Sequence, residues 1–100
     1  MTTDRAAVLA AYAALEDAVA AVDNLDYTGL DIRTLLELQS RRETLNCAAA
    51  AVDHRILAAA QTQANAKDIG AKDWPEVLHV RLRISREEAR RQVRDTDNLG

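Results

Sequence analysis

Phenylalanine is absent from this chain of 100 residues, and aromatic residues make up only 3% of it. Glycine and proline, the residues that disfavour helix interiors most, number only three and one. The interior must therefore come from Leu, Val, Ile and Ala, which favours closely packed helices over a deep pocket for a small-molecule substrate. No stretch shows the sustained alternation of apolar and polar residues typical of a strand. These absences predict an all-α fold.

Cysteine occurs once, as Cys47, so the chain can form neither an internal disulfide nor a zinc knuckle. The two histidines, His54 and His79, fall on different expected helices without a metal-binding spacing, and we interpret both as surface or packing residues. No glycine-rich phosphate loop is present. We therefore predict no metal, no cofactor and no catalytic residue, and we expect that the chain is not an enzyme.

Targeting and membrane-spanning segments are also missing from the sequence. Asp4 and Arg5 lie close together at the start, and Glu16 and Asp17 break the alanine-rich stretch that follows. A signal peptide would instead have a basic start and an uninterrupted apolar block. No apolar run is long enough to cross a bilayer. With a single cysteine, these features predict a cytoplasmic protein without a membrane partner.

A strong positive charge is the last missing feature, since the formal net charge is −3. The charge is unevenly distributed, because residues 72–100 carry seven basic and six acidic side chains. Arginine outnumbers lysine eleven to two. The usual electrostatic signature of nucleic-acid binding is therefore weak over the whole chain.

The stretch from Asp31 to about Ala64 organises the chain, and its pattern predicts one long helix. Apolar residues recur there at alternating spacings of three and four, which is a heptad seam, and only Arg42 interrupts it. Such a helix would be roughly 50 Å long, so the rest of the chain is expected to pack along a rod. The seam consists of Leu35, Leu38, Leu45, Ala49, Val52, Ile56 and Ala59.

The residues before the long helix predict a first helix over about 4–23. Turn residues fill the stretch 24–30, and Asp31 is a plausible N-cap for the long helix. Because the link between the two seamed helices is short, we predict an antiparallel helical hairpin. In it, Arg42 would either pair with an acidic residue such as Glu16 or Asp17 or set the helix register. The seam of the first helix consists of Val8, Tyr12, Leu15, Val19 and Val22.

The second helix is the longer of the two, so its C-terminal part would extend beyond the first. Runs of alanine at 48–51 and 58–60 allow other backbones to approach this part closely. The C-terminal third of the chain, a second copy, or both could cover it, and the sequence leaves these alternatives equally open. If a homodimer forms, its candidate interface residues are Ala49, Val52, Ile56 and Ala59.

Two short helices are predicted after the polar segment that ends the long helix, over about 74–83 and 86–97. Gly70 provides a permissive turn residue before them. Asp73 and Glu76 have the spacing of a capping box, as do Ser85 and Glu88. The sequence thus predicts a single helical domain over 1–100. Because it stops abruptly at 99–100, we expect it to be the N-terminal module of a longer protein.

The two short helices and the tight turn between them suggest a helix-turn-helix-like pair. Arg91 lies four residues from both Glu87 and Asp95, so it is expected to be neutralised. His79 and Arg83 depart from the motif, because a small residue and a glycine usually occupy these positions. Taken alone, the residues slightly favour a solvated arginine face over a DNA contact. The DNA-binding candidates are Arg83 and three arginines that are spaced four residues apart and form one stripe of the helix, Arg86, Arg90 and Arg94.

The segments at 69–72 and 82–94, closing on 99–100, resemble the 13E12-repeat family of actinobacterial HNH-endonuclease-like proteins. They read Ile-Gly-Ala-Lys and Leu-Arg-Ile-Ser-Arg-Glu-Glu-Ala-Arg-Arg-Gln-Val-Arg. The N-terminal module of that family is a domain of unknown function, number 222. The Leu-Leu-Glu-Leu pattern that begins at Leu35 also looks similar. Trp74 departs from the family, which usually has a small or aliphatic residue there.

Longer members of the family end in an HNH nuclease domain, so the resemblance implies a parent protein that acts on DNA. This chain has no counterpart of the HNH residues, and no catalytic residue is carried over. The resemblance therefore favours a non-catalytic helical module that binds or targets double-stranded DNA. The alternative is a helical dimerisation or protein-interaction module without direct DNA contact.

Overall fold

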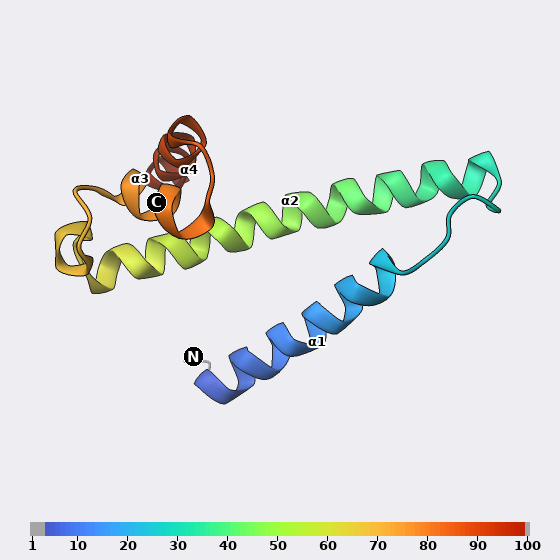
Figure 1. Cartoon of the computed structure of the whole chain (residues 1–100), viewed down its shortest axis with the longest axis horizontal. Coiled ribbons are helices and arrows are strands. Elements are labelled where there is room, and N and C mark those ends of the chain that lie inside the picture. Colours follow the sequence, from blue (N-terminus) through green and yellow to red (C-terminus); the bar gives the residue numbers. More distant parts are fainter. Residues whose placement is uncertain (1–3, 100) are drawn as a thin grey trace. The chain divides into compact units, whose positions relative to one another are not determined.

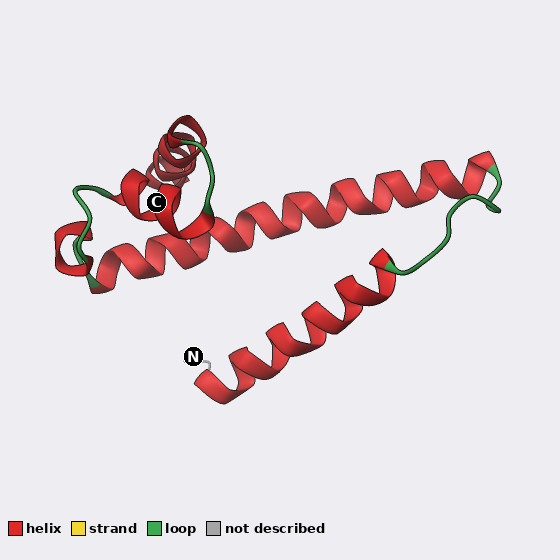
Figure 2. Ribbon diagram, in the orientation of Figure 1, coloured by secondary structure: helices red, strands yellow, loops and turns green. Residues whose placement is uncertain are grey.

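The computed structural model describes residues 4–99 and is built from helices (Figure 1). Four α-helices and one short 3-10 helix follow one another, and the described residues contain no strand (Figure 2). The predicted all-α class is therefore confirmed. Gly100, which closes the family-like segment, lies outside the described residues. The elements are α1 (Arg5–Asp23), α2 (Ile32–Gln63), η1 (Ala66–Ile69), α3 (Trp74–Leu82) and α4 (Arg86–Leu99).

The chain divides into two compact units, whose boundary falls within α2. We call Met1–Leu38 the N-terminal unit and Gln39–Gly100 the C-terminal unit. The first unit contains α1 and the beginning of α2, and the second contains the rest of α2 with η1, α3 and α4. The pairing of α1 with α2 in an antiparallel hairpin stays a prediction.

Acidic side chains cap both helices that begin in the N-terminal unit. The Asp4 carboxylate accepts a hydrogen bond from the backbone N–H of Ala7 at 2.8 Å, which starts α1. The Asp31 carboxylate accepts one from the N–H of Thr34 at 3.0 Å, as its expected role as the N-cap of α2 requires. These bonds satisfy amide groups that the first helical turn leaves unpaired. The side chain of Thr34, and then its backbone N–H, stabilise the charged form of Asp31 and so lower the pKa of Asp31.

The turn between α1 and α2 is held by its own side chains. Asp26 accepts hydrogen bonds from the backbone N–H and the hydroxyl of Thr28, at 3.0 and 2.7 Å. Both bonds favour the carboxylate, so the pKa of Asp26 is lowered. The Tyr27 hydroxyl donates to the carbonyl of Val22 at 2.8 Å. Local polar chemistry thus determines where the chain leaves α1.

No described residue of the N-terminal unit is buried. The apolar residues on the seam of α1 have exposed fractions between 38% for Val8 and 59% for Val19. A heptad pattern makes a helix amphipathic, but it does not specify which surface will cover the apolar side. Stabilisation within this unit therefore comes from helix propensity and caps more than from burial.

The C-terminal unit has a small core to which four elements contribute. α3 packs against α4, and Ala89 on α4 is completely buried. Short connections allow these elements to meet, because η1 ends at Gly70 in the left-handed conformation (φ 86°) and α3 begins only a few residues later. The buried residues are Leu57, Ala66, Val77, Ala89 and Thr96.

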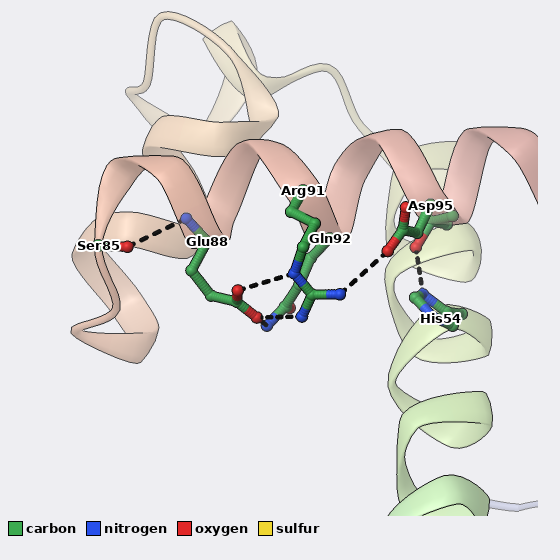
Figure 3. Close-up of polar contacts among 7 residues, drawn as sticks. His54, Ser85, Glu88, Arg91, Gln92 and Asp95 are labelled. Carbon is green, nitrogen blue, oxygen red and sulfur yellow. Dashed lines mark hydrogen bonds and ion pairs between the residues drawn. The ribbon is translucent and has the colours of Figure 1, made fainter.

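A hydrogen bond connects α2 to α4 at the edge of this core. Nδ1 of His54 lies 2.8 Å from the hydroxyl oxygen of Thr96, whose side chain is 4% exposed (Figure 3). The buried hydroxyl of Thr96 thereby gains a hydrogen-bond partner. Without one, its burial would lower the free energy of unfolding. The interpretation of His54 as a packing residue agrees with this contact. The C-terminal segment thus covers the face of α2 around Leu57.

Candidate nucleic-acid interface

The first element of the candidate interface is α3, and its start follows from three neighbouring residues. The Asp73 carboxylate accepts from the backbone N–H of Glu76 at 2.9 Å, and Pro75 occupies the first turn, where a missing N–H does no harm. A capping box also predicts that the Glu76 carboxylate accepts a hydrogen bond from the backbone N–H of Asp73, and this part of the prediction is wrong. The Glu76 carboxylate accepts from the N–H of Lys72 at 3.4 Å, one residue before the cap.

The turn between α3 and α4 holds Arg83 in the left-handed conformation, at φ 56° and ψ 40°. This is the position where the motif usually has glycine, because any other side chain costs about 1–2 kcal/mol there. His79 braces the turn, since its Nδ1 lies 2.6 Å from the carbonyl oxygen of Ile84. A carbonyl only accepts, so Nδ1 of His79 carries the hydrogen. The two residues that depart from the motif thus both belong to the turn: Arg83 adopts its left-handed conformation, and His79 forms a hydrogen bond to it.

Ser85 begins α4, as its position predicts. Its hydroxyl accepts from the backbone N–H of Glu88 at 3.0 Å, and its carbonyl accepts from the N–H of Ala89 at 3.0 Å. The predicted reciprocal bond of this capping box is wrong, because the Glu88 carboxylate bonds Arg91 instead (Figure 3). A charged guanidinium is a stronger donor to a carboxylate than a backbone amide.

Arg91 is the neutralised arginine of α4, although one of its predicted partners is wrong. Its Nε donates to Glu88 at 2.8 Å, a second nitrogen donates to the same carboxylate, and Nη1 donates to Asp95 at 3.1 Å (Figure 3). Arg91 therefore pairs with Glu88, three residues before it, and not with the predicted partner Glu87, four residues before it. Gln92 also donates to Glu88, at 3.1 Å.

These contacts shift the pKa values of both charged partners in α4. Hydrogen bonds from Arg91, and then from Gln92, lower the pKa of Glu88 to about 2 from an ordinary value of 4.5. The pKa of Arg91 is raised, mainly by its hydrogen bonds to Glu88. Both groups thus remain charged at neutral pH, and two carboxylates balance the charge of Arg91.

The four candidate DNA contacts differ from Arg91 in having no such partners. Arg83, Arg86, Arg90 and Arg94 are all exposed, and none forms an ion pair with another described residue. Behind them, Ala89 is buried and Val93 is half-buried, as the expected apolar stripe requires. We call Arg86, Arg90 and Arg94 the arginine stripe. The helix thus presents three guanidinium groups on its polar side.

Sequence reasoning missed that Lys72 lies close to this stripe. A cavity of about 80 Å³ lies between the start of α3 and the first two turns of α4. Spacing along one helix could not reveal Lys72, because the packing of α3 on α4 brings it there. The lining residues are Lys72, Asp73, Pro75, Glu76, Arg86 and Arg90.

The candidate oligomer interface lies on α2, where the structure places its residues in two environments. Val52 is half-buried, whereas Ala49, Ile56 and Ala59 are exposed, with Ile56 54% exposed. Cys47 is exposed, and its thiol lies 3.6 Å from a carboxylate oxygen of Glu43. The C-terminal segment therefore covers only one face of this stretch.

Residues 4–99 contain no group of three or more His, Cys, Asp and Glu side chains arranged to hold a metal ion. None of their helices combines the length and apolar character needed to cross a lipid bilayer. Compared with known proteins, the chain matches no family model, no curated protein and no solved structure. The resemblance to the 13E12-repeat family thus stays a prediction.

Proposed function

We propose that this chain is a non-catalytic DNA-binding module in which α3 and α4 contact the double helix. The observation that carries the proposal is the exposed arginine stripe. Its members lie four residues apart on one helix and lack acidic partners within the described chain, whereas the adjacent Arg91 forms ion pairs with Glu88 and Asp95. Unpaired guanidinium groups on a helix suit phosphates and the acceptor edge of guanine.

The conformation of Arg83 supports the same proposal. Glycine would cost less free energy in the left-handed backbone at this position, so the presence of an arginine there suggests a use for its guanidinium group. It lies in the turn directly before α4, next to the start of the stripe. In a helix-turn-helix pair, this location brings a side chain near the DNA backbone at the entry of the second helix.

The parent protein belongs to the same proposal. Under the resemblance to the 13E12-repeat family, the module would target an HNH-nuclease-like protein to DNA in an actinobacterial cytoplasm. The module itself would be no enzyme, and double-stranded DNA would be its partner. The chain is acidic overall, so binding would depend on the local stripe and not on bulk charge.

The test is a fluorescence-anisotropy titration of labelled duplex DNA at low and physiological salt. The triple variant R86Q/R90Q/R94Q should bind at least about tenfold more weakly, with a smaller salt dependence, because each lost phosphate contact lowers the slope by about one. R33Q/R41Q/R55Q is the matched control, since it removes three exposed arginines from α2 and gives the same net charge. Equal affinities for the two triple variants, or no binding by the unmodified chain at low salt, would overturn the proposal.

A second candidate is homodimerisation through α2. The observation that favours it is the exposed apolar surface there, where Leu45 is 66% exposed and Ile56 54% exposed. Apolar side chains in a row on one helix are typical of partner surfaces. Light scattering should then report twice the monomer mass, and Ile56→Glu should restore the monomer. A monomer at high concentration would remove this candidate.

A further inference from the structure

The cavity between α3 and α4 has the size and the charged lining expected of a subsite for one tetrahedral anion. Its volume of about 80 Å³ is well above the roughly 10–15 Å³ that one water molecule needs on the same measure, so a small anion fits. Lys72, Arg86 and Arg90 supply three positive charges to its lining, against two negative charges from Asp73 and Glu76. The lining is therefore positive although the chain as a whole is acidic.

The two carboxylates in the lining are already engaged with backbone amides. Asp73 accepts from the N–H of Glu76 at 2.9 Å, and Glu76 accepts from the N–H of Lys72 at 3.4 Å. Neither forms an ion pair with a cation of the lining in the described structure. The acidic groups thus hold the turn before α3 in place, and the three cations stay free for an outside anion.

The cations come from two segments that the fold brings together. Gly70 reverses the chain after η1 with φ 86°, and the N–H of Ala71 bonds the carbonyl of Ala66 at 3.0 Å, which fixes the turn that leads to Lys72. Arg86 and Arg90 lie in the first two turns of α4. Guanidinium groups bind phosphate oxygens in a bidentate manner, and lysine adds a compact charge.

We propose that Lys72, Arg86 and Arg90 form a binding pocket for one phosphate of a nucleic-acid backbone. This inference rests on the proposed DNA-binding function and refines it. Arg86 and Arg90 anchor the backbone in the pocket, whereas Arg94 lies outside the cavity lining and stays available for other contacts. The pocket thus sets the position of α4 on the nucleic acid, and Lys72 belongs to the interface despite lying outside the stripe.

The chain offers a matched pair for the test, because Lys67 and Lys72 are its only two lysines. Lys67 is exposed on η1 and does not line the cavity. In anisotropy titrations with labelled duplex DNA at about 100 mM salt, Lys72→Gln should weaken binding by about threefold to tenfold and lower the salt slope by about one. Lys67→Gln should leave both values close to those of the unmodified chain.

A second pair tests the acidic side of the pocket. Glu76→Gln removes one negative charge from the lining, and its amide oxygen can still accept the bond from the N–H of Lys72. It should tighten DNA binding more than Glu87→Gln, which removes a charge from an exposed position outside the lining. Equal affinities for Glu76→Gln and Glu87→Gln would argue against a phosphate beside Glu76.

The outcomes separate this inference from the proposed function. DNA binding that depends on the stripe but is weakened equally by Lys72→Gln and Lys67→Gln would overturn the pocket alone. Absence of DNA binding would overturn both. A titration of the unmodified chain with inorganic phosphate, followed by amide NMR shifts at constant ionic strength, separates the two sources of phosphate. Saturable shifts at Lys72, Arg86 and Arg90 without DNA binding would assign the pocket to a free anion and overturn the backbone assignment.

Discussion

The two units of this chain use the same kinds of residues but obtain different amounts of burial from them. In residues 4–38 no side chain is buried, although α1 carries a regular apolar seam. In the C-terminal unit, five residues from four elements are buried, two of them alanines and one a threonine. The difference shows that a regular seam on one helix counts for less than several short elements joined by tight turns, which bury even small residues.

The comparison predicts a large difference between two leucine substitutions. Leu57 in the C-terminal unit is 7% exposed, so Leu57→Ala should lower the free energy of unfolding by about 2–4 kcal/mol through lost burial and a residual cavity. Leu15 on α1 is 54% exposed, and Leu15→Ala should cost less than about 1 kcal/mol, because alanine is also a better helix former. Urea unfolding followed by circular dichroism measures both values.

The reverse result would break the comparison. If Leu15→Ala costs as much as Leu57→Ala, the seam of α1 is covered in solution by another apolar surface, as the predicted hairpin or a homodimer would require. Repeating the measurement at several protein concentrations would distinguish these two arrangements, since only the stability of a dimer depends on concentration.

A smaller effect concerns pH and sharpens the description of α4. The pKa of Glu88 is about 2 in the folded chain and 4.5 ordinarily, so its carboxylate binds protons less readily when folded. Its contribution to stability is therefore fully present above pH 4.5 and is lost as the pH falls towards 2. Because Glu88 lies at the surface, salt should weaken the effect.

The measurement is the difference in unfolding midpoint between the unmodified chain and Glu88→Gln as a function of pH. This difference should be largest at neutral pH and should shrink between pH 4.5 and 2. Asp26 and Asp31 also have lowered pKa values, but they are present in both proteins and cancel. A difference that stays constant with pH would show that the Glu88–Arg91 contact contributes no stability in solution.

Local features of the sequence predicted much of the fold. The caps at Asp31, Asp73 and Ser85 each depend on a side chain and an amide three residues away, so spacing alone reveals them. The bounds of the α-helices lie close to the expected ones for the same reason. η1 was not expected, although Asn65 and Asp68 show a cap-like spacing, and the N–H of Asn65 indeed donates to Asp68 at 3.0 Å.

Competition between partners explains what spacing could not predict. The Glu88 carboxylate could accept a hydrogen bond either from the backbone N–H of Ser85 or from Arg91. It bonds Arg91, because a charged guanidinium is the stronger donor. The His54–Thr96 hydrogen bond and the cavity lined by both Lys72 and Arg86 depend on how α3 and α4 pack and leave no periodic signal. The arginine stripe and the neutralisation of Arg91 were both predictable from spacing, but spacing indicated Glu87 as a partner where the structure pairs Arg91 with Glu88.

The most direct test of the central claim is a map of amide NMR shifts in the intact, labelled chain upon addition of unlabelled duplex DNA. The C-terminal helix pair should respond, with the largest changes at Lys72 and between Arg83 and Arg94, while α1 and the first half of α2 should keep their shifts. Changes confined to α1 or α2, or no changes at low salt, would contradict the assignment of the DNA contact to α3 and α4.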